Sequence, residues 1–302
     1  MLSVIIPAYN EEAMLRKAAE TIGDLLTYEG IGYEMIFVND GSEDNTQNIL
    51  EQLTAENPRI HYVQLSRNFG KEAAISAGLA TCKGDCAAVM DCDLQHPPKT
   101  LVEMYRLWEQ GFEVIEGVKN DRGKESLAYR AGAKSFYRIM SRSVGMDMTH
   151  ASDFKLLDRK AVDALLSLPE YHMFFRALSH WIGFKTASVT YDVQPREAGK
   201  SKWSARKLTK YAINNIMEFS SVPLQVVTWI GVLGFIVSII MGIQTLVRYF
   251  MGYAAEGFTT VILLLLFLGS IIMIGLGIIG MYIAKIYDEV KHRPRYIITK
   301  MK

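Results

Sequence analysis

Short apolar runs alternate with longer amphipathic segments over the first part of the chain. The apolar runs have the length of buried strands, whereas the segments between them carry apolar side chains at helical spacing. This alternation predicts an α/β domain whose mostly parallel sheet is covered by helices on both faces. In chain order, the expected elements are a strand at 3–6, a helix at 11–26, a strand at 35–38, a helix at 45–55, a strand at 60–65, a helix at 71–80 and a strand at 87–90.

The pattern changes near Ser221, where two long apolar stretches begin. Residues 222–247 and 258–284 contain no Asp, Glu, Lys or Arg. Each stretch is longer than the roughly 20 residues with which a helix crosses a hydrocarbon core of about 30 Å. We therefore predict two transmembrane helices within residues 221–284. Buried helices of a soluble protein are the alternative, which two adjacent stretches of this length disfavour.

Basic residues flank this pair of stretches on both outer sides, at 200–210 and 285–302, while the loop between them holds one Arg and one Glu. Because positively charged flanks stay in the cytoplasm, we expect an inner or plasma membrane protein with both termini and a domain of residues 1–200 in the cytoplasm. Residues 201–220 have apolar positions at helical spacing and basic positions on other faces. They predict an amphipathic helix in the membrane interface, with a core helix as the alternative. Residues 285–302 are expected to form a basic cytoplasmic tail.

Overall charge and cysteine content exclude several classes of protein. The net charge of +1 gives no case for nucleic acid as a partner. The three cysteines, Cys82, Cys86 and Cys92, form no C-x-x-C pair, so neither a disulfide framework nor a zinc site is expected. No G-x-G-x-x-G follows the first strand and no complete G-x-x-x-x-G-K-[ST] loop occurs, so a bound nucleotide requires a different site.

Polar and charged residues follow each of the four expected strands. In parallel sheets, ligands bind beyond the carboxyl ends of the strands. Ordinary turn and cap chemistry explains any one of these clusters, but four at one edge predict a ligand site. Asp40 is suited to accept hydrogen bonds from a base or ribose, and Arg67 and Lys71 to contact phosphates. The clusters are residues 7–12, 39–42, 66–71 and 91–95.

Asp91 and Asp93 follow the strand at 87–90 and are separated by one residue. In an extended strand, residues i and i+2 point the same way, so both carboxylates would face one point and repel each other. Carboxylate oxygens and an amide carbonyl such as that of Gln95 suit Mg²⁺ or Mn²⁺. The pattern therefore predicts a divalent cation at Asp91, Asp93 and Gln95. The alternation points His96 away from this site.

Five segments resemble, in order, the family-2 glycosyltransferases, which have the GT-A nucleotide-sugar-binding (Rossmann-like) fold. With two C-terminal membrane helices, the chain is most similar to the polyprenyl-phosphate glycosyltransferases, such as the bactoprenol glucosyltransferases, the formamido-arabinose transferases and the dolichyl-phosphate mannose synthases. The resemblance covers nearly the whole chain. The segments are SVIIPAYNEE (3–12), VNDGSEDNT (38–46), SRNFGKEAAISAGL (66–79), MDCDLQHPP (90–98) and ASDFKLLDR (151–159).

The resemblance implies roles for individual residues. The nucleoside-binding positions match Pro7, Tyr9, Glu11 and Asp40, and the metal and diphosphate site matches Asp91, Asp93 and Gln95. Asp153 matches an acidic residue near the reacting centre. Together with Asp93 of the metal site, it is a catalytic candidate. The basic residues implied at the acceptor and the phosphates, for which a solvated surface is the alternative, are Arg122, Arg130, Arg196, Lys200 and Lys202.

The resemblance implies inverting transfer of a sugar from a nucleoside-diphosphate sugar to a polyprenyl (undecaprenyl) phosphate at the cytoplasmic membrane face, for modification of a cell-envelope glycan. It favours UDP-glucose, while GDP-mannose, UDP-N-acetylglucosamine, UDP-galactose and a modified arabinose donor stay open. A processive polysaccharide synthase is disfavoured because the chain lacks a Q-x-x-R-W motif. A non-catalytic membrane subunit is the alternative from another class. Because the family includes tetramers, a homo-oligomer is a further expectation.

Overall fold

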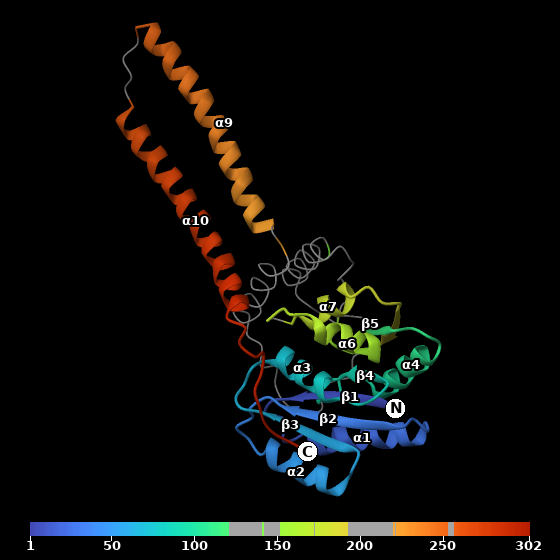
Figure 1. Ribbon diagram of the computed structural model, residues 1–302. Coiled ribbons are helices and arrows are strands. Elements are labelled where there is room, and N and C mark those ends of the chain that lie inside the picture. The colour runs from blue at the N-terminus through green and yellow to red at the C-terminus, as the bar shows by residue number, and fades with distance from the viewer. Residues whose placement is uncertain (121–140, 142–151, 172, 193–219, 221, 253–256) are drawn as a thin grey trace. The chain divides into compact units, whose positions relative to one another are not determined.

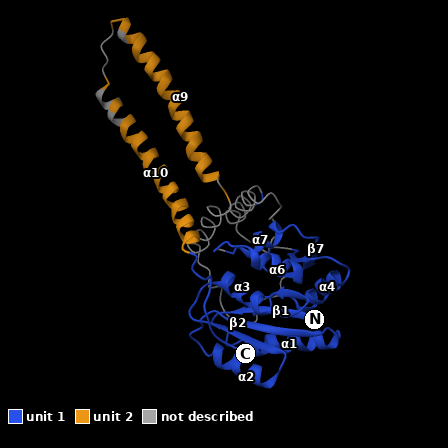
Figure 2. Ribbon diagram, in the orientation of Figure 1, with its two compact units in different colours: residues 1–205, 292–302 blue, residues 206–291 orange. Residues whose placement is uncertain are grey.

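The computed structural model describes residues 1–120, 141, 152–171, 173–192, 220, 222–252 and 257–302 (Figure 1). The chain divides into two units, residues 1–205 with 292–302 and residues 206–291 (Figure 2). Arg122, Arg130, Arg196, Lys200 and Lys202 lie outside the described residues, as does nearly all of the predicted amphipathic helix.

The first unit is built on a sheet that has eight strands among the described residues. The strands are β1 (Leu2–Ala8), β2 (Tyr33–Asn39), β3 (Ile60–Leu65), β4 (Cys86–Val89), β5 (Val114–Lys119), β6 (Lys155–Asp158), β7 (Thr186–Tyr191) and β8 (Ile298–Met301). They lie in the order β7-β5-β6-β4-β1-β2-β3-β8. The four strands predicted from the sequence form the centre of this sheet as β1, β2, β3 and β4.

Most neighbouring strands are parallel, as predicted: β1 pairs with β2 and β4, β2 with β3, and β5 with β7. The exceptions are β6, which runs antiparallel between β4 and β5, and β8, which runs antiparallel to β3. The antiparallel register pairs Val89 with Lys155. The residues that precede β6 therefore lie beside those that follow β4. This pairing brings Asp153 to the same edge of the sheet as Asp91.

Helices cover both faces of the sheet (Figure 1). One face carries α1 (Leu15–Tyr28), α2 (Thr46–Glu56) and α4 (Pro98–Glu109), and the other carries α3 (Lys71–Thr81), α6 (Arg159–Ser167) and α7 (Phe175–Trp181). Local sequence explains their ends: Pro98 begins α4, a position that proline favours, and the side chain of Asp158 caps α6 by accepting the N–H of Lys160.

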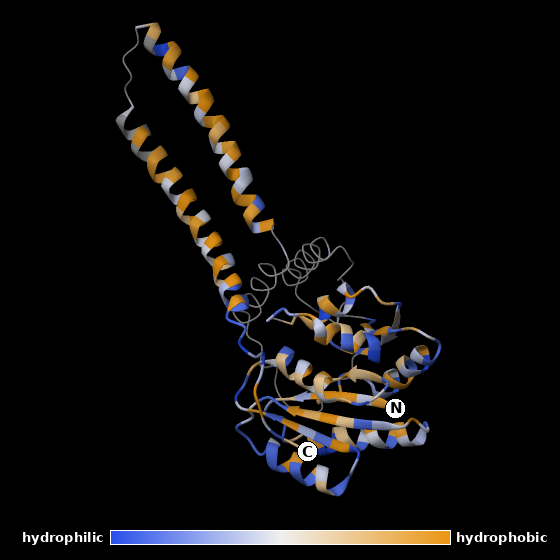
Figure 3. Cartoon of the chain, viewed as in Figure 1, coloured by the Kyte–Doolittle hydropathy of each residue, from blue (hydrophilic) through white to orange (hydrophobic). Residues whose placement is uncertain are grey.

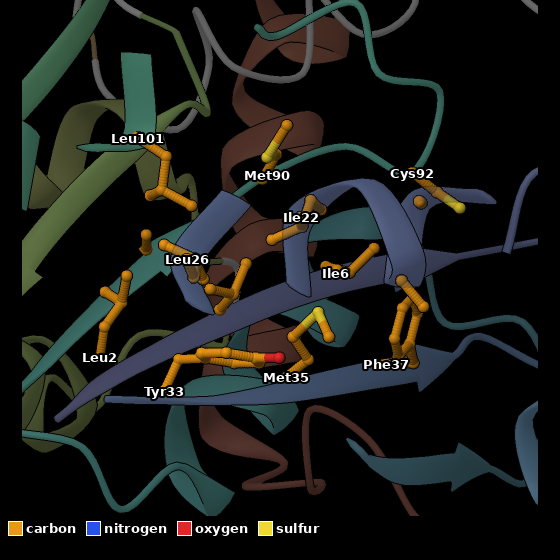
Figure 4. Close-up of a cluster of buried hydrophobic side chains, with 14 of the residues drawn as sticks. Leu2, Ile6, Ile22, Leu26, Tyr33, Met35, Phe37, Met90, Cys92 and Leu101 are labelled. Carbon is orange, nitrogen blue, oxygen red and sulfur yellow. The ribbon is translucent and has the colours of Figure 1, made fainter. Parts of the chain in front are cut away.

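The core between the sheet and α1 holds side chains from the central strands (Figure 4). Leu2, Val4 and Ile6 of β1 pack with apolar residues that recur every third or fourth position of α1, including Ile22 and Leu26. Each such fully buried side chain contributes about 1.5–3 kcal/mol to stability. Met90 and Cys92 join the same cluster, and they anchor the segment that follows β4.

The second unit contains α9 (Val222–Phe250) and α10 (Phe258–Val290). Two candidate membrane spans, Val222–Arg248 and Leu264–Val290, are each 27 residues long with a mean hydropathy of 2.5 (Figure 3). Their apolar side chains are largely exposed, which is the opposite of what the core helix of a soluble protein shows. Length and composition thus suit two membrane crossings, close to the predicted ranges.

The C-terminal tail returns to the first unit and closes one edge of its sheet. Tyr62 and Lys302 exchange two backbone hydrogen bonds of 3.1 Å, and the N–H of Ser66 donates to the carbonyl of Ile297 at 2.9 Å. The Arg295 guanidinium donates to the carbonyl of Leu168. Strand β8 has no apolar pattern of its own, so it is not predicted from the sequence.

Deleting residues 297–302 is expected to destabilise the first unit. The deletion removes β8 and leaves the backbone groups of β3 unpaired at the edge. With about 0.5–1.5 kcal/mol for each net hydrogen bond and about 2–4 °C per kcal/mol for a domain of this size, Tm should fall by roughly 5 °C. The control is Lys300→Ala, which removes an exposed ion pair with Glu51 and a contact 6.0 Å from the centre of the Tyr62 ring and should leave Tm almost unchanged. An unchanged Tm in the deletion variant would show that β8 contributes nothing.

Candidate active site

The loops that follow β1 and β2 are tied to each other by side-chain hydrogen bonds. The N–H of Asn10 donates to Oγ of Ser42 at 2.9 Å, and the N–H of Glu43 donates to Oδ1 of Asn10 at 2.8 Å. The N–H of Asn45 donates to Oε2 of Glu12 at 2.9 Å. Part of the polar sequence at this edge is therefore turn chemistry, which stabilises two loops in a fixed relation.

Asp40 holds the next loop, residues 66–70, against the end of β2. Its two carboxylate oxygens accept the N–H groups of Phe69 at 2.7 Å and Gly70 at 2.9 Å. Burial raises the pKa of Asp40, although these two hydrogen bonds oppose the shift. Gly41 has φ +66° and lies so close to Arg67 that a Cβ would stand 2.4 Å from its backbone. Only glycine fits here, so the two loops meet closely.

The residues predicted to bind the nucleotide all lie at this edge. Pro7 is near the end of β1, and Tyr9 and Glu11 are half-buried in the loop that follows. Arg67 is exposed, and its guanidinium lies 4.1 Å from the centre of the Phe69 ring. The sheet thus brings these side chains together.

The segment that contains Asp91 and Asp93 is a turn, in contrast to the extended strand that we expected. Strand β4 ends at Val89, Leu94 has φ +55°, and the N–H of Gln95 donates to Oδ1 of Asp93 at 3.1 Å. Burial nevertheless alternates as predicted, because Asp91, Asp93 and Gln95 are half-buried whereas Cys92 and Leu94 are buried. An Asx turn replaces the strand because Asp accepts hydrogen bonds from the backbone that follows it.

His96 lies in the core beside this turn, consistent with its exclusion from the predicted ligands. Its ring stacks on Phe154 at 4.6 Å, and Nδ1 accepts the N–H of Asp91 at 3.4 Å. Burial lowers the pKa of His96.

Asp153 is the centre of a compact network of charges. It is 6% exposed, and its Oδ1 and Oδ2 accept hydrogen bonds from Nε and Nη2 of Arg176 at 2.6 and 2.8 Å. Nζ of Lys71 lies 2.9 Å from Oδ2 of Asp153 and 2.6 Å from Oδ1 of Asp91. Burial opposes ionisation of Asp153, but Lys71 and Arg176 outweigh it and hold the pKa of Asp153 well below its usual range. Asp153 is therefore a carboxylate at neutral pH.

Glu72 adds a carboxyl group to this network. Burial raises the pKa of Glu72 to about 8, and the nearby charge of Asp153 acts in the same direction. The N–H of Phe175 donates to its Oε2 at 3.0 Å. Glu72 was not predicted from the sequence; the available signal was a carboxyl group directly after Lys71 in the first turn of a helix.

The Glu72→Gln variant is expected to flatten the pH dependence of stability. The pKa of glutamate is about 4.3 in an unfolded chain, whereas the pKa of Glu72 in the folded protein is raised to about 8. Between these values the folded state binds more protons, so stability falls as pH rises, and the loss is complete above the folded pKa. Gln cannot titrate, and Tm measured from about pH 5 to about pH 9 should decline less than in the wild type. The exposed variant Glu20→Gln on α1 should keep the wild-type slope; an unchanged slope in Glu72→Gln would contradict the shift.

A second group of charges lies beneath Arg176. Lys155 of β6 is fully buried, forms an ion pair with Glu116 of β5, and donates to Oγ of Ser179 at 2.7 Å. Its Nζ also donates to the carbonyl of Arg176 at 3.2 Å. Burial lowers the pKa of Lys155 although Glu116 opposes the shift. These contacts fix α7 and so the backbone that presents the Arg176 guanidinium to Asp153. This group was not predicted from the sequence; the available signal was a charged residue inside each of two apolar strands.

Asp91 and Asp93 fit a divalent cation whose other ligands include oxygens of a bound phosphate. In the described part of the chain, no group of three or more His, Cys, Asp or Glu is arranged to hold a metal ion. Mg²⁺ and Mn²⁺ are commonly bound through one or two carboxylates together with substrate phosphates. Two half-exposed carboxylates suit that mode of binding. Lys119, at the end of β5, is a further cation whose charge interacts with both aspartates.

The fold of the first unit is that of a GT-A enzyme. It is similar to glucosyl-3-phosphoglycerate synthase from Mycobacterium tuberculosis, which was crystallised with Mn²⁺, uridine diphosphate and phosphoglyceric acid, with a TM-score of 0.52. The similarity covers 72% of this chain and 76% of that one at 19% identity, a level that bears on the fold alone. This likeness, with an acidic edge beyond parallel strands, defines the fold as GT-A.

Residues 3–166 match glycosyl transferase family 2, and the chain belongs to that family. It is 38% identical to the putative glycosyltransferase CsbB of Bacillus subtilis, over 99% of this chain and 92% of that protein. It is 34% identical to the SfII prophage-derived bactoprenol glucosyl transferase of Shigella flexneri, over 99% of this chain and 97% of that protein. The family and fold expected from the motifs are confirmed.

Proposed function

We propose that this glycosyltransferase transfers glucose from UDP-glucose to a polyprenyl phosphate at the cytoplasmic face of a membrane, with inversion at the anomeric carbon. One observation carries the proposal: similarity to the Shigella flexneri bactoprenol glucosyl transferase extends over 99% of the chain. It therefore includes both the acidic edge of the sheet and the two candidate spans. The glucosylated lipid phosphate would serve the modification of a cell-envelope glycan.

The reaction requires one bond to form and one to break. A phosphate oxygen of the acceptor forms a bond to the anomeric carbon of glucose as the bond from that carbon to the diphosphate oxygen breaks. The electron pair of the broken bond leaves with UDP. A phosphate monoester has a second pKa of about 6, so the nucleophile is largely deprotonated at neutral pH and needs no strong base.

The surroundings of Asp153 support a positioning role for it. A general base needs a pKa near the working pH, but Asp153 is strongly acidic and both of its oxygens are paired with Arg176 and Lys71. Its carboxylate would orient these two cations toward the phosphates. It is also suited to stabilise positive charge that develops on the sugar.

The acidic turn would hold a divalent cation together with the donor. When bound, Mg²⁺ or Mn²⁺ offsets negative charge on the leaving diphosphate. Asp91, Asp93 and Gln95 would bind it, and the Mn²⁺ and uridine diphosphate in the Mycobacterium tuberculosis enzyme support this assignment. Pro7, Tyr9, Glu11 and Asp40 would contact the nucleoside, with Arg67 and Lys71 near its phosphates.

The membrane would bring the acceptor to this site. In this proposal α9 and α10 span the bilayer, residues 1–200 and the tail at 285–302 face the cytoplasm, and residues 201–220 lie in the interface. The basic flanks of the two spans support this orientation. Acceptor and donor phosphates would meet Arg122, Arg130, Arg196, Lys200 and Lys202. Two spans per chain are also suited to pack in a homo-oligomer.

A donor panel distinguishes the proposal from its alternatives. Membranes that contain the protein are incubated with undecaprenyl phosphate, Mg²⁺ and, separately, radiolabelled UDP-glucose, UDP-galactose, UDP-N-acetylglucosamine and GDP-mannose. We expect label in the lipid fraction from UDP-glucose above all others. Preference for another sugar would correct the donor, and label in a polymer would indicate a processive synthase. Label in no fraction would contradict the proposal.

A further inference from the structure

Lys71 occupies a position that is electrostatically unfavourable for lysine. It is the first residue of α3, after Gly70. The N-terminus of a helix carries partial positive charge, which disfavours a cation there. Two carboxylates offset this cost, because Nζ of Lys71 lies 2.6 Å from Oδ1 of Asp91 and 2.9 Å from Oδ2 of Asp153. Burial disfavours the charged form, yet these carboxylates raise the pKa of Lys71 above its usual value. The ammonium thus belongs to the acidic pair.

The two carboxylates that Lys71 joins differ in what else they can bind. Asp153 is buried and already paired with Arg176. Asp91 has a side chain that is 33% exposed and sits on the turn with Asp93. One carboxylate is thus held inside the protein, whereas the other faces the place where a divalent cation would bind.

We propose that Lys71 is a resident counter-cation, which neutralises Asp91 in the donor-free enzyme and releases it when a divalent cation binds with the donor diphosphate. This inference rests on the proposed function for the identity of that diphosphate. A lysine ammonium sits on a flexible four-carbon stem, so it can leave Asp91 and contact a phosphate while Asp153 stays nearby. When the metal binds without the donor, it must displace the Lys71 ammonium from Asp91, and no donor phosphate is present for that ammonium to contact. Metal and nucleotide should therefore strengthen each other's binding.

The test measures Mn²⁺ affinity in the full-length protein in detergent, from the electron paramagnetic resonance signal of free Mn²⁺, with and without UDP. For the wild type we expect weak Mn²⁺ binding that UDP strengthens. In Lys71→Met, Mn²⁺ affinity without UDP should rise about tenfold, because no ammonium competes with the cation for Asp91. A tenfold change corresponds to about 1.4 kcal/mol. The strengthening by UDP should shrink in the same variant. Lys71→Gln removes the charge but keeps a hydrogen-bond donor, and it should show the same changes in Mn²⁺ affinity. It replaces Lys71→Met in the test if Lys71→Met does not fold.

Lys119→Met is the matched control. Its ammonium interacts with Asp91 and Asp93 through charge, but no ion pair of Lys119 is found in the described part of the chain. Its loss should change Mn²⁺ affinity much less than the loss of Lys71. Equal tightening in both variants would show a general effect of positive charge and overturn the proposal, as would unchanged or weaker Mn²⁺ binding in a folded Lys71 variant.

The outcome is separable from that of the proposed function. Glucose transfer by the wild type with unchanged Mn²⁺ affinity in the Lys71 variants would refute only the counter-cation. Tighter Mn²⁺ binding in those variants, in a protein that transfers no sugar, would support the counter-cation and refute the proposed reaction.

Discussion

Replacing Asp93 with asparagine is expected to lower the rate of sugar transfer by on the order of 10³-fold, as expected for the loss of an essential electrostatic contact in the transition state. Asp93 is half-buried on the turn after β4 and accepts the N–H of Gln95. The amide oxygen of Asn can accept the same hydrogen bond, so the turn should keep its shape. What the variant loses is negative charge at the point where the diphosphate and its cation would bind.

Rate and Tm should be measured together on purified protein, since an intact fold is part of the expectation. The control is Asp85→Asn, because Asp85 is an exposed aspartate paired with the chain's N-terminal amine. It should transfer sugar at the wild-type rate. Near-normal transfer by Asp93→Asn would show that Asp93 holds neither the cation nor the diphosphate.

Replacing Asp153 with asparagine should damage both stability and activity. The carboxylate is buried between Lys71 and Arg176, and removing one partner of a buried ion pair costs about 3–5 kcal/mol. Because both cations are partly exposed, we expect about 2–3 kcal/mol after solvent screening. Transfer should fall by on the order of 10²-fold or more, since the two cations lose the group that orients them.

The free energy of unfolding should be measured by chemical denaturation at a pH above the unfolded pKa of aspartate, which is about 3.9. A carboxylate with a lowered folded pKa stabilises the protein there, and that contribution is lost as pH falls through the folded pKa. Wild type and Asp153→Asn should therefore converge in stability under strongly acidic conditions. The exposed variant Asp163→Asn removes only a surface pair with Arg159 and should lose less than about 1 kcal/mol. A stable, active Asp153→Asn enzyme would remove Asp153 from the site.

The central strands were predictable because their signal is local. Strands β1 to β4 are rich in apolar residues and largely buried, and polar residues mark their ends. Strands β5 to β8 were not predicted. Two of them, β6 and β8, are stabilised by antiparallel pairing with distant strands rather than by their own pattern. Pairing between segments far apart in the chain leaves no periodicity to detect.

The candidate site was predictable to the same extent. Asp91, Asp93 and Asp153 were found through motifs, but the cations between them were not placed. Lys71 and Asp153 are 82 positions apart, and Arg176 lies 23 positions after Asp153. The alternation at residues 91–95 was predicted correctly, although a turn with Leu94 at φ +55° produces it. The apolar side chains of this segment pack into the core and the polar ones stay partly exposed, and a turn allows this arrangement as well as a strand does.

The most direct test of the proposed reaction is a single incubation of the purified full-length protein, in liposomes, with undecaprenyl phosphate, Mg²⁺ and UDP-glucose. The product lipid is analysed by mass spectrometry, and its anomeric configuration by nuclear magnetic resonance. We predict one glucose per lipid phosphate, joined through the phosphate oxygen with the configuration opposite to that of the donor, and one UDP released for each. A lipid phosphate that stays unmodified while the protein is folded would contradict the proposal.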